Sequence, residues 1–268
     1  MTLEQINHYL RNIFKEYGIL RITDNCHGIV AGGCIAELLR IDHDSFAERD
    51  FKLTGDIDLY VPSVINNEKV FEVFINQIRR NAKDLVREAS IKSTLQCRVI
   101  FENLPELNII LCRDENNVTH IDMLDRGDLN NLIKRFDLCC VKCGVMFNND
   151  NLIYRIETDK ANYIFNRIAL LSEESLVLNH IYGLLARLYK YKLKGFKIDP
   201  KNESFLKLKC CVEDIPLNTI IEDCNSPINT SEEDLNKLYM LNSETISKFH
   251  DVFSGQTIQD AINKIIYG

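Results

Sequence analysis

The segment Asp56-Ile57-Asp58-Leu59-Tyr60-Val61 alternates carboxylates with apolar side chains. Such alternation is typical of a β-strand with one buried face, and residues two apart on a strand point to the same side. Asp56 and Asp58 are therefore expected to lie side by side. Two neighbouring carboxylates repel each other unless a cation lies between them. Hard oxygen ligands suit Mg²⁺, which also coordinates water and phosphate, so the segment predicts a metal site that handles a nucleotide.

A glycine pair upstream supplies a possible phosphate site. Residues 28–31 are predicted to form a short buried strand and residues 33–40 the helix after it, so Gly32 and Gly33 fall at the turn between them. Glycine allows backbone N–H groups to approach an anion closely, and the N-terminus of a helix favours negative charge. The order strand, Gly-Gly, helix and then an Asp-x-Asp strand is more specific than either motif alone.

This order of motifs resembles the polymerase-β-like nucleotidyltransferase superfamily. That superfamily has an apolar strand ending in Gly-Gly or Gly-Ser, a helix, a strand with Asp-apolar-Asp, and a third carboxylate on a neighbouring strand. Four residues match the first two elements, and the best match to the third is an aspartate that opens the apolar run 137–141: Gly32, Gly33, Asp56, Asp58 and Asp137. The resemblance implies an α+β fold in which a mixed sheet is flanked by helices.

One feature of the sequence departs from the superfamily pattern, and another offers a second candidate for the third carboxylate. In this sequence, 22 residues separate Gly33 from Asp56, so the charged segment 41–55 is expected to be an enlarged loop. Asp122, between apolar residues, competes with Asp137 for the place of the third carboxylate. The sequence after Asp122 is typical of a helix start, which favours a capping or surface role for Asp122.

A second resemblance lies downstream. The pattern Arg187-x-x-Lys190-Tyr191-x-x-x-Gly195-Phe196 is similar to a helix end found in poorly characterised, viral-type proteins. Those proteins also carry the Gly-Gly, Asp-x-Asp and Phe-Asp-Leu segments in this order, so the likeness covers about residues 25–198. Arg187 and Lys190 lie three residues apart and share a helix face. They are expected to contact the triphosphate.

The resemblance implies a reaction. Asp56, Asp58 and Asp137 would bind Mg²⁺ or Mn²⁺, and an NTP would lie on the glycine turn. An acceptor hydroxyl would attack the α-phosphorus, an NMP group would transfer, and pyrophosphate would leave. RNA is the favoured acceptor. The alternatives are protein nucleotidylation of the AMPylation type, a non-catalytic nucleotide-binding or interaction module, and a metal-dependent phosphatase or nuclease.

Composition agrees with an intracellular enzyme. The net charge of −7 argues against a broadly basic nucleic-acid surface, although basic residues cluster at 187–197. No apolar run is long enough to span a bilayer, and the first residues lack a signal-peptide pattern. The ten cysteines are scattered in apolar segments and are expected to be reduced. A cytoplasmic location is expected, in the host cytoplasm if the protein is viral.

Other cysteine and histidine patterns favour structural roles. Cys140 and Cys143 form a C-x-x-C on a predicted strand, but no second pair lies at zinc spacing, so they are expected to be core thiols. The six histidines are dispersed. His27, next to the predicted strand 28–31, is expected to be structural.

Periodicity predicts two domains. Residues 1–156 are expected to form the catalytic domain, and residues 157–268 a helical C-terminal domain. The elements expected in the first domain include helices at 2–17, 66–88 and 129–135, strands at 97–101, 107–111 and 151–156, and a strand that begins at Asp137. The helices expected in the second domain are 161–171, 174–194, 202–213, 231–241, 243–253 and about 257–266.

Overall fold

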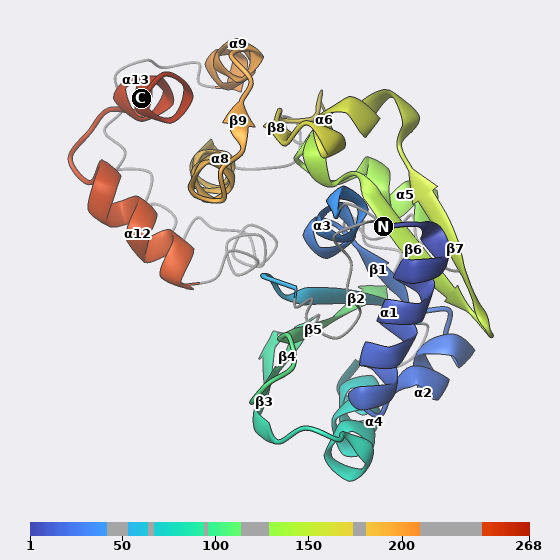
Figure 1. Ribbon diagram of the computed structural model, residues 1–268. Coiled ribbons are helices and arrows are strands. Elements are labelled where there is room, and N and C mark those ends of the chain that lie inside the picture. Colours follow the sequence, from blue (N-terminus) through green and yellow to red (C-terminus); the bar gives the residue numbers. More distant parts are fainter. Residues whose placement is uncertain (42–52, 64–66, 94–95, 114–128, 174–180, 210–242) are drawn as a thin grey trace. The chain divides into compact units, whose positions relative to one another are not determined.

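The computed structural model describes residues 1–41, 53–63, 67–93, 96–113, 129–173, 181–209 and 243–268 (Figure 1). The chain divides into two compact units. The first comprises residues 1–134 and 141–161, and the second comprises residues 135–140 and 162–268. The loop predicted at 41–55, Asp122 and the helix predicted at 231–241 lie wholly or mostly outside the described residues. Among the described residues, no helix has the length and apolar character needed to cross a membrane.

The first unit is built on a mixed sheet. Its described residues form seven strands in the order β3-β4-β5-β2-β1-β6-β7, in which β2 and β5 are parallel and the other neighbours are antiparallel. The predicted α+β class is confirmed. The strands are β1 Ile29–Ala31, β2 Ile57–Ser63, β3 Val86–Ser93, β4 Gln96–Phe101, β5 Leu107–Arg113, β6 Cys143–Asn148 and β7 Asn151–Ile156.

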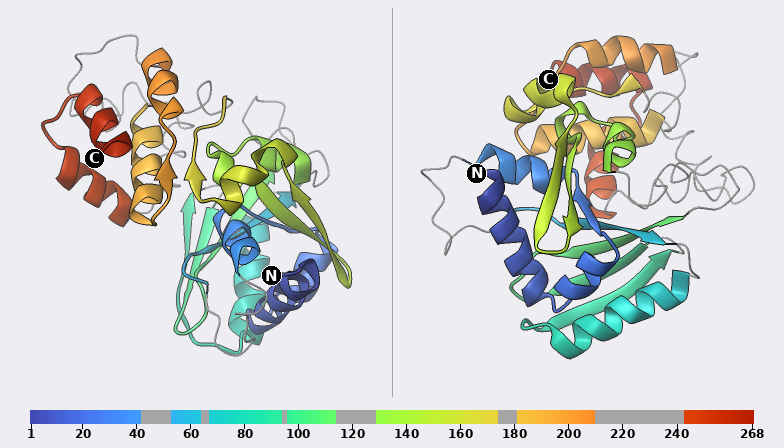
Figure 2. Two further views of the ribbon diagram at one scale, coloured as in Figure 1. Left: turned by 45° about the horizontal axis from the view of Figure 1, so that its top comes forward. Right: turned by 90° about the vertical axis from the view of Figure 1, so that its right-hand side faces the viewer.

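Five helices of the described residues pack around parts of this sheet, and α1 and α4 lie on the same side of it (Figure 2). They are α1 Leu3–Glu16, α2 Leu20–Asn25, α3 Gly33–Arg40, α4 Asn67–Asn81 and α5 Leu129–Lys134. Helix α1 begins where Thr2 and Gln5 form a capping box. Its apolar stripe buries Phe14 against Phe147, and the following Tyr17 stacks on Phe101 of β4. This packing holds one face of the sheet in the core.

The opposite face of β4 carries half-exposed side chains. Along β4 the residues alternate, so that Cys97, Val99 and Phe101 are buried while Arg98 is partly exposed. On β2, buried Ile57 and Leu59 alternate with Asp58 in the same way. One side of this part of the sheet is therefore apolar core, and the other side is available for polar chemistry.

The second unit combines helices with a small sheet. Its elements include α8 Ile181–Leu193, α9 Lys201–Lys209, α12 Ser243–Phe253 and α13 Ile258–Ile266, and α6 Ala161–Phe165 lies at its border with the first unit. Strands β8 Ile168–Ala169 and β9 Lys197–Ile198 pair in parallel. The prediction of helix was therefore wrong at β8, which falls within the predicted helix 161–171, whereas β9 lies between two predicted helices. An aromatic cluster of α8 and α12 fills the core, with Tyr182, Tyr189, Phe249 and Phe253 in edge or tilted contact.

Three further expectations from the sequence are corrected. The helix predicted over 66–88 ends at Asn81, and the edge strand β3 follows. The helix predicted over 161–171 ends at Phe165. The strand predicted from Asp137 is instead a 3₁₀ turn, Cys139–Val141, before β6. Residues 137–139 bond to another segment, since Cys139 N–H donates to Leu170 O and Ser172 N–H donates to Asp137 O.

Gly18 provides a test of the packing between α1 and α4. It has a φ of +77°, and a Cβ at this position would lie 2.6 Å from the carbonyl carbon of Asn81. Gly18→Ala is expected to lower the free energy of unfolding by at least about 2 kcal/mol, because backbone strain and overpacking add. Gly255 has the same φ with open space around it, so Gly255→Ala should cost only about 1–2 kcal/mol. Urea unfolding measures the free energy of unfolding of both variants. Equal losses of stability would contradict the argument from packing.

Candidate active site

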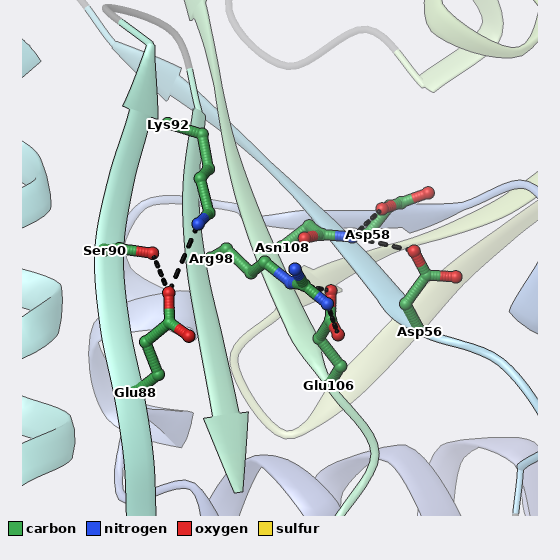
Figure 3. Close-up of polar contacts among 8 residues, drawn as sticks. All are labelled: Asp56, Asp58, Glu88, Ser90, Lys92, Arg98, Glu106 and Asn108. Atoms are coloured by element: carbon green, nitrogen blue, oxygen red, sulfur yellow. Dashed lines mark hydrogen bonds and ion pairs between the residues drawn. The ribbon is translucent and has the colours of Figure 1, made fainter. Parts of the chain in front are cut away.

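Asp56 and Asp58 lie at the start of β2, on the polar face of the sheet. Asp56 directly precedes the strand and is exposed, whereas Asp58 is half-buried within it. Their carboxylates share one partner. Asn108 on β5 donates from Nδ2 to Asp56 Oδ2 at 2.8 Å and to Asp58 Oδ1 at 3.0 Å (Figure 3). The two side chains thus converge on one point, as the alternation in the sequence predicted.

The segment that leads into Asp56 is tied to helix α3. Thr54 donates from its backbone N–H at 3.0 Å and from its hydroxyl at 2.9 Å to the Glu37 carboxylate. At the start of the strand, Ile57 N–H donates to Glu106 O at 2.8 Å. These bonds fix the backbone on both sides of Asp56.

The glycine turn lies at the same end of the sheet as the carboxylates. Strand β1 runs antiparallel to β2 with Val30 opposite Leu59, so the next step along each strand brings Ala31 opposite Asp58. Gly32 follows with a φ of +88°, a conformation that favours glycine, and caps α3. Its N–H is held by Cys143 O at 2.9 Å. The backbone N–H groups in the first turn of α3, which have no partner within the helix, therefore lie beside the aspartate pair.

Cys34, in the first turn of α3, lies near the aspartate pair. Burial raises the pKa of its thiol well above the ordinary value, and the nearby negative charges of Asp58 and Asp56 raise it further. A protonated, buried thiol in the first turn of α3 is a packing residue and not a nucleophile. Cys143 behaves alike, since burial raises its pKa strongly, and both cysteines are free.

Asp137 and Arg187 belong to the second unit, where they are paired. Arg187 Nε lies 2.5 Å from Asp137 Oδ2, and the side chains are 28% and 10% exposed. The sequence assigned Asp137 to the metal and Arg187 to the triphosphate, and these roles remain predictions. The structure adds that each has the other as a charged partner. Lys190 lies one turn further along α8 and is partly exposed.

The rest of the basic cluster has mixed surroundings. Lys192 donates to the last carbonyls of α13, Lys264 O and Ile265 O, at 2.9 and 3.0 Å. This is a capping contact that stabilises the end of a helix. Lys194 and Lys197 are exposed beyond α8, with the Lys194 ammonium 5.8 Å from the Tyr191 ring centroid. Two exposed cations therefore remain available to an anionic ligand.

The residue that sequence reasoning missed is Asn108. It is 5% exposed and lies opposite Asp58 in the parallel pair β2–β5. The superfamily pattern calls for a third carboxylate on a neighbouring strand, and a search for carboxylates passes over an asparagine. Only the register of the β2–β5 pair places Asn108 next to the aspartates. Among the described residues, no three His, Cys, Asp or Glu side chains are grouped to hold a metal ion.

The donor set nevertheless fits a hard divalent cation. Two carboxylates converge on one amide group, and Mg²⁺ commonly uses one or two carboxylates together with substrate phosphates and water. The adjacent helix N-terminus suits a phosphate. The chemistry of the residues is therefore compatible with a metal–triphosphate complex.

A family model described as "Gad2: Gabija anti-defense 2 family protein" matches residues 2–163. The chain belongs to the Gabija anti-defense 2 family. The match covers the whole described sheet of the first unit, including the aspartate pair and the glycine turn. No curated protein matches the sequence.

Solved structures share the fold at low identity. "The complex structure of CCA-adding enzyme with ATP" is 13% identical with a TM-score of 0.51, over 99% of this chain and 51% of that one. "The structure of CCA-adding enzyme apo form I" is 13% identical with a TM-score of 0.51, over 95% of this chain and 49% of that one. This family member thus spans about half the length of those enzymes. The likeness supports a nucleotidyltransferase fold.

Proposed function

We propose that the chain is a metal-dependent nucleotidyltransferase that moves an NMP group from an NTP to an acceptor hydroxyl and releases pyrophosphate. The observation that carries this proposal is the convergence of Asp56 and Asp58 beside the Gly32 turn. A binding module for apolar ligands or peptides has no need of two carboxylates that meet at one point. The glycine turn beside the Asp-x-Asp strand fits a phosphatase or nuclease less well.

The residues take separate roles in this reaction. Asp56 and Asp58 would hold Mg²⁺ or Mn²⁺, which supplies charge neutralisation for the triphosphate and for the transition state. Backbone N–H groups at Gly33 and the first turn of α3 would bind phosphate oxygens, and Gly32 allows the turn. The acceptor hydroxyl attacks the α-phosphorus, and the bond to the pyrophosphate oxygen breaks.

The sequence also assigned Asp137, Arg187 and Lys190 to this reaction. Asp137 is proposed as the further carboxylate, which accepts the proton of the attacking hydroxyl or completes the metal site. Arg187 and Lys190 would offset the charge of the departing pyrophosphate. Because Arg187 is paired with Asp137, both roles require that this ion pair exchange partners when the nucleotide binds.

RNA is favoured as the acceptor. The exposed Lys194 and Lys197 follow α8 and would attract a phosphodiester backbone. Structures of this fold include CCA-adding enzymes, one of them with ATP. The family description, an anti-defence protein directed at Gabija, makes a protein of that system the second acceptor to test. Protein nucleotidylation is therefore the alternative outcome of the same assay.

The test uses the purified chain with Mg²⁺ or Mn²⁺ and each of the four α-labelled NTPs. A host lysate is divided into RNA and protein fractions, and Asp56→Ala/Asp58→Ala serves as the blank. We expect label to enter the RNA fraction with the intact chain only. Label in the protein fraction would replace RNA by a protein acceptor. Absence of transfer from every nucleotide to both fractions would contradict the proposed activity.

A further inference from the structure

Asn108 is a neutral side chain that contacts both carboxylates of the candidate site. It lies on β5 directly opposite Asp58, on the same face of the sheet, and is almost completely buried. One amide nitrogen serves both carboxylates, at 2.8 Å to Asp56 and 3.0 Å to Asp58 (Figure 3). Without such a donor, two neighbouring carboxylates would repel each other. The amide therefore provides part of the stabilisation that a cation would otherwise give.

The hydrogen bonds from Asn108 also bear on how a cation could bind to both aspartates. A cation shared by Asp56 and Asp58 would lie close to the Asn108 amide, because Nδ2 donates to one oxygen of each carboxylate. The other end of the amide is an acceptor. Rotation of the amide can thus replace two donor contacts by an oxygen facing the cation, without movement of β5.

A neighbouring carboxylate, Glu106, is already engaged. Glu106 precedes Asn108 by two residues on the same side, and Arg98 of β4 lies opposite Asn108. Arg98 binds Glu106 through Nε and Nη2, both at 2.5 Å, and this pairing raises the pKa of the guanidinium. The bidentate geometry directs Glu106 toward β4 (Figure 3). Glu106 is therefore held as the partner of Arg98, next to the site.

We propose that Asn108 is a positioning residue that holds Asp56 and Asp58 together before the metal binds. The inference rests on the proposed function and deepens it. With two negative charges, the aspartate pair binds a divalent cation weakly by itself. The triphosphate supplies the missing charge, so metal and nucleotide bind together. The amide keeps the empty pair from being forced apart by repulsion.

Calorimetric titration with Mn²⁺ tests this dependence. The wild-type chain is titrated alone and with an equimolar mixture of the four α,β-methylene NTP analogues. We expect weak binding alone and at least about tenfold tighter binding with the analogues. Asn108→Asp adds the third charge, so it should bind Mn²⁺ alone at least about tenfold more tightly than the wild type. Asn108→Ala should bind about tenfold more weakly than the wild type in the presence of the analogues.

Two controls separate charge from folding. Asn108→Asp places three carboxylates together and is expected to melt at a lower temperature without metal, with the loss restored by Mn²⁺. Asp56→Asn/Asn108→Asp returns the count to two charges and should bind Mn²⁺ alone as weakly as the wild type. This double variant keeps the test usable if the single variant folds poorly.

The outcomes distinguish this inference from the proposed function. Suppose that Asp58→Ala abolishes Mn²⁺ binding while Asn108→Asp and Asn108→Ala bind as the wild type does. The metal site would then stand and the role of Asn108 would be overturned. If the wild type binds no Mn²⁺ even with the analogues, the metal site of the proposed function fails, and the role of Asn108 falls with it.

Discussion

Asp58→Ala is expected to reduce nucleotidyl transfer at least about 10³-fold while the fold is retained. The carboxylate lies at the convergence point with Asp56 and Asn108, and electrostatic stabilisation of a transferring phosphoryl group is usually the largest single contribution to catalysis. Initial rates of label transfer under saturating Mg²⁺ measure the loss. Circular dichroism and the melting temperature show whether the variant folds.

Glu88→Gln is the matched control for this prediction. Glu88 is an exposed carboxylate on the same side of the sheet, two strands beyond β5, and it is bound to Ser90 and Lys92. The substitution neutralises one carboxylate and leaves the aspartate pair unchanged, so the rate of nucleotidyl transfer should stay within about twofold of the wild type. Equal loss in both variants would point to the charge of the surface and not to a metal site.

Arg187→Ala is expected to lower the stability of the second unit markedly. Removing one partner of a largely buried ion pair leaves the other without compensation, which typically costs about 3–5 kcal/mol. Since Arg187 is 28% exposed, we expect about 2–3 kcal/mol here. Hydrogen exchange of the α8 amides, read by mass spectrometry, measures the loss within this unit. Asp137→Ala/Arg187→Ala should cost less than the sum of the single variants.

Lys207→Ala provides the comparison for this pair. Lys207 lies 2.8 Å from Glu203, four residues earlier on α9 of the same unit, and it is 47% exposed. An exposed pair of this kind contributes about 0.5 kcal/mol or less. If Arg187→Ala costs no more than Lys207→Ala, the Asp137–Arg187 pair is not a structural element. Additive single variants would lead to the same conclusion.

The elements nearest to the site could be predicted from local pattern. Strand β2 and helix α3 fall where alternation and the Gly-Gly turn placed them, and the hairpin of β4 and β5 does as well. In each case the side-chain period and the turn residues lead to the same structure, and such agreement is what makes a segment predictable. The register between β1 and β2 then brings the two motifs to one end of the sheet.

Errors arose where local pattern is ambiguous or where distant contacts decide. The first residues of strand β3 were predicted as the end of a helix, although Glu88, Ser90 and Lys92 alternate with Ala89 and Ile91. The apolar run after Asp137 has the composition of a buried strand. Its backbone instead forms a 3₁₀ turn and bonds to residues 170–172. Periodicity cannot separate these possibilities in a run of four or five residues.

The position of Asn108 could not be predicted for another reason. Its significance depends on the register of a parallel strand pair whose members are 50 residues apart in sequence. An asparagine between Leu107 and Ile109 is unremarkable in sequence terms, and only the pairing places it against both carboxylates. The Arg98–Glu106 pair is similar, since its members lie eight positions apart with a turn between them.

Equilibrium binding of labelled NTPs tests the central claim most directly, because it needs no acceptor. Each of the four NTPs is titrated onto the wild-type chain with Mg²⁺ or with EDTA, and onto Asp56→Ala/Asp58→Ala with Mg²⁺. The account predicts binding of at least one NTP that requires the cation and is lost in the double variant. Binding that is equal with Mg²⁺, with EDTA and in the double variant would contradict it and would identify a metal-independent nucleotide-binding module.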